Sequence, residues 1–166
     1  MNIDSLITAI HDTTLSEAIR GDIPGTEWVF PIIETFHVLC LTVLFGSISM
    51  VDLRLLGLTN SRVPFTTIFR ELIPWTWAAF AGAAVFGTIL ATGKIDDYMH
   101  TPVFLAKFVL MAFAGVNMLV FHAVYRHAEA WDKAVPTPRG ARAAGALSLI
   151  FWVGIVLCGR WVGFVT

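Results

Sequence analysis

Charged residues are scarce in this chain, and their scarcity indicates the class of protein. They make up 14% of the 166 residues, against about 25% in soluble domains, while hydrophobic residues make up 57%. The formal net charge is only −1, so no basic surface for nucleic acid is indicated. This composition is typical of a single-domain protein embedded in a membrane.

Several signatures of catalysis and export are also absent. The two cysteines, Cys40 and Cys158, lie in apolar runs and form no Cys-x-x-Cys pair, which argues against a disulfide framework. No phosphate loop or Ser/His/Asp arrangement is present, so hydrolase chemistry has no support. Residues 1–21 lack the basic start and apolar middle of a secretory signal, so we expect the first spanning segment to direct insertion.

Four long apolar stretches are present instead. Each has about the 20 residues that a helix needs to cross a hydrocarbon core of about 30 Å. They cover residues 30–56, 72–93, 102–124 and 143–164. No charged residue lies between Thr35 and Val51, and the third and fourth spans are interrupted only by Lys107 and Arg160. We therefore predict an all-α fold, a four-span transmembrane helix bundle.

The N-terminal region, residues 1–27, differs from the rest of the chain. Apolar residues within 3–20 recur at the spacing of one helix face, which predicts an amphipathic helix lying on the membrane surface. A polar tail is the alternative. Gly21 and Gly25 end this segment, and residues 28–166 form the predicted transmembrane domain.

The distribution of Lys and Arg indicates the orientation of the spans. The first and third connections are flanked by Arg54, Arg62, Arg70, Arg126, Lys133, Arg139 and Arg142. The opposite side has only Arg20, Lys94 and Arg160, together with the embedded Lys107. By the positive-inside rule, both connections lie in the cytoplasm and both termini on the periplasmic side of a bacterial inner membrane.

Small residues are frequent in the second and fourth spans, and helices in lipid pack closely through such residues. They include Gly82 and Gly87 in the second span, and Gly154, Gly159 and Gly163 in the fourth. These residues predict either packing within the bundle or a seam between copies of the chain. Because so small a bundle leaves much of its surface free, we expect a homo-oligomer surrounded by membrane lipid.

Ionisable residues from separate spans fall at similar depths when each helix rises by about 1.5 Å per residue. The predicted outer layer contains Glu34, His37, His100, Lys107 and Arg160. The predicted inner layer contains Asp52 and His122, with Asn117 and Arg126 as further members. At about 100° per residue, His37 and Asp52 share one face of the first span, which we expect to meet the third span. Ionisable groups in lipid are costly unless paired, protonated or bound, so these layers are the candidate sites.

These residues also have simpler explanations. His37 could donate a hydrogen bond to a carbonyl group, while Lys107 and Arg160 could extend to the membrane surface. Glu34 could form an ion pair with Arg160 or Lys107. The remaining histidines lie near the interfaces, where water would satisfy them. The agreement in depth between separate spans is what favours a shared function.

The first functional hypothesis is b-type haem, because imidazole is its usual axial ligand and helical bundles commonly hold cofactors between facing helices. His37 is the first candidate ligand and His100 the second. Lys107 and Arg160 would pair with the propionates through charge-assisted hydrogen bonds. His122 could hold a second haem on the inner side, which would permit electron transfer across the membrane between a donor and an acceptor that the sequence does not identify.

Two alternatives remain open. A copper or other transition-metal site would use Glu34 and His37, which form a Glu-x-x-His pair, together with Met99 and His100. A non-redox transport subunit or scaffold would use the buried charges only to fix the register of the helices. Elemental analysis separates haem iron from copper, and alanine variants of the buried residues separate both from the scaffold.

The third span, TPVFLAKFVL at residues 101–110 followed by Asn117 and His122, resembles the Lys-bearing helix of HemJ-type protoporphyrinogen oxidases and of copper-resistance D-type membrane proteins. The first span is similar to the His-bearing first helix of the HemJ type, whose His and Lys are linked to haem. The four-span layout also resembles small bacterial membrane proteins of unknown function. The resemblance implies tetrapyrrole or copper binding in a possible oxidoreductase, with His37 and Lys107 as the corresponding residues. The second span has no matching signature, so protoporphyrinogen oxidation itself is not implied.

Overall fold

The computed structural model describes residues 3–59, 64–125 and 137–165. These residues are largely helical and include no strand, so the predicted all-α fold is confirmed. The helices are α1 (Ile3–His11), α2 (Thr14–Arg20), α3 (Val29–Leu56), α4 (Phe65–Thr92), α5 (Ile95–His100), α6 (Pro102–Val124) and α7 (Arg139–Val165).

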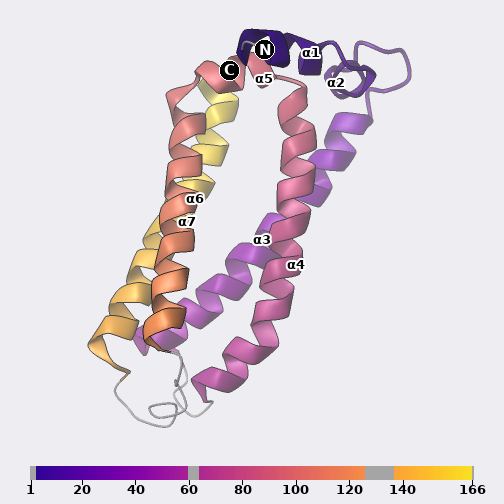
Figure 1. Cartoon of the computed structure of the whole chain (residues 1–166). Helices are drawn as coiled ribbons and strands as arrows, with labels where there is room; N and C mark the ends of the chain where they lie inside the picture. Colours follow the sequence, from indigo (N-terminus) through magenta and orange to yellow (C-terminus); the bar gives the residue numbers. More distant parts are fainter. Residues whose placement is uncertain (1–2, 60–63, 126–136, 166) are drawn as a thin grey trace.

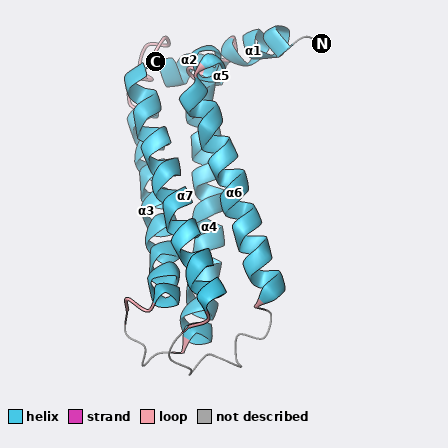
Figure 2. Cartoon of the chain, turned by 90° about the vertical axis from the view of Figure 1, so that its left-hand side faces the viewer, coloured by secondary structure: helices cyan, strands magenta, loops and turns pink. Residues whose placement is uncertain are grey.

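Helices α3, α4, α6 and α7 are each long and apolar enough to cross a membrane. They extend along one another in a single bundle (Figures 1 and 2). Large apolar side chains cover its outside, and Leu39, Val109 and Ile150 are each more than half exposed. So much exposed apolar surface is unusual for a soluble monomer but suits contact with lipid. The structure is therefore consistent with a multi-pass membrane protein.

Two of the long helices begin earlier than the predicted spans. Helix α4 begins at Phe65 rather than at residue 72, and α7 begins at Arg139 rather than at residue 143. Phe65 and Ala141 are almost fully buried, in a cluster that three residues of α3 and α6 complete: Val51, Leu55 and Phe121. Hydropathy places the start of a span after charged residues such as Arg70, whereas the helix extends as far as its apolar face is covered.

Packing divides the four long helices into two pairs. Helix α3 packs most extensively on α4, α6 packs on α7, and α3 also contacts α7. Helices α4 and α6 do not pack on each other to a comparable extent. In Figure 1, α3 crosses the bundle obliquely, and the half of this helix that ends at Leu56 contacts α7 as well as α4.

Glycines permit the close approach of neighbouring helices. A Cβ atom added at Gly82 of α4 would lie 2.7 Å from Sγ of Cys40 on α3. One added at Gly145 of α7 would lie 3.1 Å from Cβ of Leu55, also on α3. The predicted packing of small residues within the bundle is therefore confirmed at these crossings. Gly163 has open space around it, and the homo-oligomer stays a prediction.

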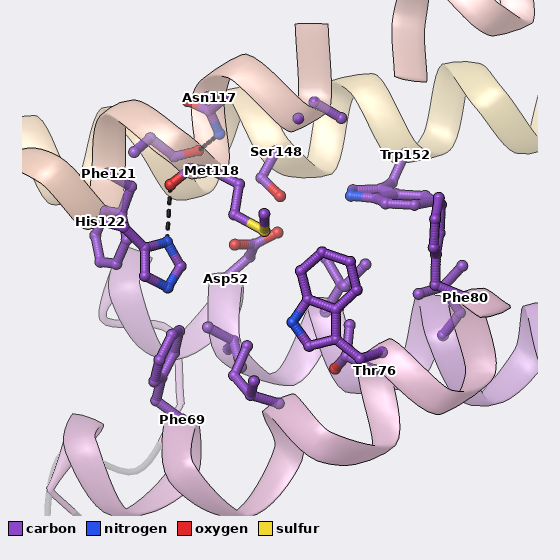
Figure 3. Close-up of a pocket in the computed structure, with 18 of the residues that line it drawn as sticks. Asp52, Phe69, Thr76, Phe80, Asn117, Met118, Phe121, His122, Ser148 and Trp152 are labelled. Carbon is purple, nitrogen blue, oxygen red and sulfur yellow. Dashed lines mark hydrogen bonds between the residues drawn. The ribbon is translucent and has the colours of Figure 1, made fainter. Parts of the chain in front are cut away.

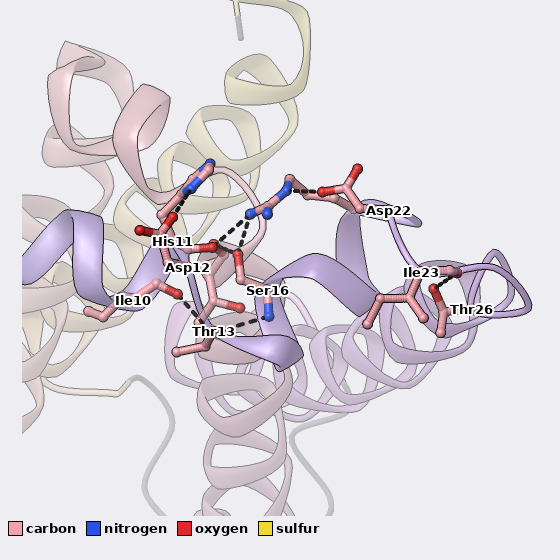
Figure 4. Close-up of polar contacts among 10 residues, drawn as sticks. Ile10, His11, Asp12, Thr13, Ser16, Asp22, Ile23 and Thr26 are labelled. Carbon is pink, nitrogen blue, oxygen red and sulfur yellow. Dashed lines mark hydrogen bonds and ion pairs between the residues drawn. The ribbon is translucent and has the colours of Figure 1, made fainter.

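Residues 3–20 form two short helices rather than the single one predicted, and Thr13 separates them (Figure 4). Its side chain donates to the Ile10 carbonyl at 2.8 Å and accepts from the Ser16 backbone N–H at 3.3 Å. Thr13 thereby caps the start of α2, as hydroxyl side chains commonly do. The predicted break at Gly21 is confirmed, because this residue ends α2 with φ at 77°, a conformation that favours glycine.

Helices α1, α2 and α5 lie together at one end of the bundle, with the end of α7 (Figures 1 and 2). We call this the terminal end, and the opposite end, where α3 and α6 finish and α4 and α7 begin, the loop end. Helix α2 is fixed to α4, because the Ser16 hydroxyl donates to the Thr92 carbonyl at 2.8 Å. Beside this bond, the buried Ile19 packs against Gly93.

Candidate functional site

A cavity of about 230 Å³ lies in the loop-end half of the bundle and is lined by all four long helices (Figure 3). Its walls are mostly apolar and include five aromatic residues: Phe69, Trp77, Phe80, Phe121 and Trp152. Its polar residues are Asp52, Thr76, Asn117, His122 and Ser148. Trp77 is 53% exposed and Phe80 is 38% exposed, so the cavity reaches the surface beside α4. A ligand could therefore enter from the surrounding lipid.

Asp52 of α3 projects into this cavity (Figure 3). The residue is 5% exposed, and its Oδ2 atom has no hydrogen-bond partner among the described residues. The carboxyl group interacts with the side chain of Ser148 on α7. An ionised carboxyl group in apolar surroundings is costly unless it is paired. Oδ2 therefore needs a proton, a cation or a hydrogen-bond donor from a ligand.

His122 of α6 presents its ring to the same cavity (Figure 3). Its Nδ1 atom lies 2.8 Å from the carbonyl oxygen of Met118. Because a carbonyl oxygen can only accept, Nδ1 carries the hydrogen, and Nε2 is the acceptor in the neutral ring. The ring also packs on Phe69, with the two centroids 5.3 Å apart. These contacts fix its orientation, as backbone contacts do for histidines that bind a ligand.

The other polar residues of the cavity make hydrogen bonds within the bundle. Nδ2 of Asn117 donates to the Ala144 carbonyl at 3.0 Å and thereby joins α6 to α7. The hydroxyl groups of Thr76 and Ser47 lie 2.8 Å apart and join α4 to α3. The structure brings together the described members of the predicted inner layer, Asp52, His122 and Asn117. Arg126 lies outside the described residues.

His37 lies in the terminal-end half of α3 and faces α4 rather than this cavity. A Cβ atom added at Gly87 would lie 2.7 Å from Cε1 of His37, so the ring occupies a notch that glycine leaves free. The ring interacts with the Ala83 backbone, yet its Nδ1 is buried without a partner among the described residues. A hydrogen bond to a carbonyl group therefore explains only one of the two ring nitrogens.

Lys107 of α6 is partly buried and faces α7. Its Nζ atom lies 3.5 Å from the position of a Cβ added at Gly159 of α7, the residue after Cys158. The charges of Lys107 and Glu34 both act on His37. These residues form a loose electrostatic group near the terminal end, in which His37 and Lys107 are held by different helices.

The alternative explanation of Glu34 as an ion-pair partner is not supported, because no salt bridge joins it to Lys107 or Arg160 in the part of the chain that the structure describes. Glu34 is exposed on the first turns of α3. Arg160 is also exposed, and its guanidinium carbon lies 5.3 Å from the ring centroid of Phe164 on the same helix. The outer layer is therefore not one assembled group, although its members were predicted at one depth.

The structure does not bring together the predicted copper ligands either, which are Glu34, His37, Met99 and His100. Residues 3–59, 64–125 and 137–165 contain no group of three or more His, Cys, Asp or Glu that could hold a metal ion. His100 and Met99 are exposed on the short helix α5, and Nδ1 of His100 lies 2.9 Å from the Asp96 carbonyl.

Ser148 and the aromatic residues of the cavity were not predicted from the sequence. Ser148 is the only hydroxyl residue between Ala146 and Cys158, and it follows Gly145 by three positions. The signal available in the sequence was therefore a single hydroxyl residue about one helical turn after a glycine. The position of Trp77 and Trp152 in the cavity was not predicted either.

This chain belongs to a family of unknown function, DUF6644, whose model matches residues 22–165. The matching region begins directly after α2 and includes all four long helices. The predicted resemblance to a family of unknown function is therefore confirmed, whereas no similarity to the HemJ-type or copper-resistance D-type proteins is shown. No curated protein and no solved structure matches the chain.

Proposed function

We propose that this chain is a membrane protein that binds b-type haem, with His37 as an axial ligand, and that it functions in electron transfer. The observation that carries the proposal is the buried Nδ1 atom of His37, which has no partner among the described residues. Buried polar atoms are nearly always satisfied, so an unsatisfied one indicates a missing partner. A haem iron is such a partner for imidazole and, when bound, supplies one-electron chemistry.

The neighbouring residues fit this assignment. The Ala83 backbone engages the ring of His37 and can fix its orientation, as backbone groups do for many ligating histidines. Lys107 of α6, whose charge acts on His37, supplies a partly buried positive charge, which suits a propionate group. Phe36 and Phe86 stack with centroids 5.5 Å apart on the same helix pair and offer apolar surface for a macrocycle. His100, exposed on α5, remains the second candidate ligand.

The proposal does not place a second haem at His122. The cavity there measures about 230 Å³. A cavity of about 150 Å³ holds a single benzene ring, and a macrocycle of four rings needs several times that volume. The cavity is therefore matched to a smaller molecule, and one haem per chain is the expected stoichiometry.

The orientation and location belong to the same proposal. The bias of Lys and Arg towards the loop end supports a cytoplasmic loop end in a bacterial inner membrane, with both termini periplasmic. A homo-oligomer is supported only by the small size of the bundle and the open space at Gly163.

The test is an absorption spectrum of the full chain purified in mild detergent from haem-sufficient cells. We expect a Soret band, a pyridine haemochrome typical of haem b and iron near one atom per chain. A folded but colourless protein would overturn the proposal. Copper without iron would instead favour the copper alternative at His37.

A further inference from the structure

Two side chains of the loop-end cavity each have a hydrogen-bond acceptor that lacks a partner among the described residues. One is Oδ2 of Asp52, which has no partner among the described residues. The other is Nε2 of His122 in the neutral form of the ring, because Nδ1 then donates to the Met118 carbonyl. Both side chains project into the same cavity from facing helices (Figure 3). A ligand that satisfies both must carry two hydrogen-bond donors.

Hydroxyl groups suit these two positions best. A hydroxyl group donates to Asp52 when the carboxyl group is ionised and accepts from it when it is protonated. At His122 only a donor fits the free nitrogen. A carbonyl group cannot donate, so it fails at His122 in the neutral ring. The pair of acceptors therefore selects a dihydroxy compound over the corresponding dione.

The walls and volume of the cavity indicate the rest of the ligand. Aromatic side chains from α4, α6 and α7 line it, which suits a flat ring. Its volume of about 230 Å³ exceeds the roughly 150 Å³ that holds benzene by enough for a few small substituents. The exposed flanks of Trp77 and Phe80 open towards the lipid, so the ligand must be soluble in the membrane.

We propose that this cavity binds a lipid-soluble hydroquinone, with one hydroxyl group on Asp52 and the other on His122. Ser148 positions the Asp52 carboxyl group, and Phe69 positions the His122 ring. This binding site does not depend on haem at His37, since the two lie in different halves of the bundle. The experiment below therefore tests it whether or not the protein is coloured.

The experiment measures binding of 2,3,5-trimethylhydroquinone to the purified full chain in lipid nanodiscs, without oxygen, by equilibrium dialysis. The matched ligand is the dimethyl ether of the same ring, which cannot donate a hydrogen bond. We expect the hydroquinone to bind at least tenfold more tightly than the ether, as the loss of one or two hydrogen bonds predicts. Equal binding of the two compounds would overturn the proposal.

Single substitutions test whether the hydroquinone binds in this cavity. Asp52→Ala and His122→Ala should each weaken hydroquinone binding about tenfold, the cost of one hydrogen bond. The control is Ser49→Ala, because Ser49 of α3 also has a buried side-chain oxygen with no hydrogen-bond partner among the described residues but does not line the cavity. If either cavity variant fails to fold, the comparison of the two ligands on the unmodified chain still decides the matter. Tighter binding of benzylammonium than of the hydroquinone would identify a cation site and contradict the proposal.

Discussion

The two ends of the bundle treat their polar residues in different ways. At the loop end, Asp52 and His122 come from different helices and line one cavity. At the terminal end, His37 is held against α4 and Lys107 against α7, and Glu34 is exposed. Polar residues at a common depth therefore converge only where the helices that carry them face a common space.

The oblique course of α3 explains this difference. His37 and Asp52 were predicted on one face of α3, yet His37 meets Gly87 of α4, whereas Asp52 meets Ser148 and the backbone near Gly145 of α7. A helix that crosses its neighbours presents one face to different partners along its length. The depth of a residue and the helix face on which it lies can thus be deduced from one helix. Whether polar residues of separate helices meet depends on how several helices pack.

The largest expected difference between the two ends is in the cofactor. If His37 is the ligand, His37→Ala should abolish the Soret band of the purified protein. His122→Ala should keep the band, because the loop-end cavity is too small for the macrocycle. The measurement compares the absorption spectra of both variants at equal protein concentration. Loss of the band in His122→Ala alone would move the haem to the loop end and reverse the comparison.

The next effect concerns packing at the terminal end. Gly87→Ala should destabilise the protein, because the added Cβ would lie 2.7 Å from Cε1 of His37. Overpacking of this kind costs about 1–3 kcal/mol. The matched control is Gly46→Ala, at a glycine of α3 with no atom within 4 Å of an added Cβ. Thermal unfolding in detergent should show a lower midpoint for Gly87→Ala only, and equal midpoints would contradict the notch at His37.

A smaller effect is expected at the loop end. Asn117→Leu removes the bond from Asn117 to the Ala144 carbonyl, which joins α6 to α7. Hydrogen bonds between membrane helices contribute about 0.6 kcal/mol on average. Thr88→Val is the control, because Thr88 is exposed and bonds only to Ala84 of its own helix. Unfolding by denaturant should separate the two variants by this amount, and an identical loss would show that Asn117 does not join the helices.

The smallest effect is a pH dependence at the terminal end. Burial raises the pKa of Tyr98 on α5 above its usual 10.0, and the charges of Asp97 and Glu34 raise it further. A phenol with a raised pKa in the folded state contributes stability below pH 10, and this stability is lost as the pH rises through the folded pKa. Tyr98→Phe should therefore be less sensitive to pH above 10 than the unmodified chain. The measurement is the midpoint of unfolding of both proteins as the pH rises above 10. Parallel curves for the two proteins would refute the prediction.

The sequence alone determined the number of long helices and their approximate positions. The runs of apolar residues are as long as the bilayer is thick, and this requirement acts on each helix separately. The break at Gly21 was equally predictable, because it depends on local backbone conformation. The split at Thr13 was missed, although a hydroxyl side chain that caps a second helix is also a local signal.

Only the tertiary structure decided which polar residues meet. Asp52, His122 and Asn117 were predicted as a layer and do line one cavity, whereas the outer layer of Glu34, His37, His100, Lys107 and Arg160 was predicted by the same reasoning and is not assembled. The outcome depends on contacts between residues far apart in the chain, such as Gly87 with His37 and Gly145 with Leu55. These contacts fix how each helix crosses its neighbours, and no periodicity within one helix contains that information.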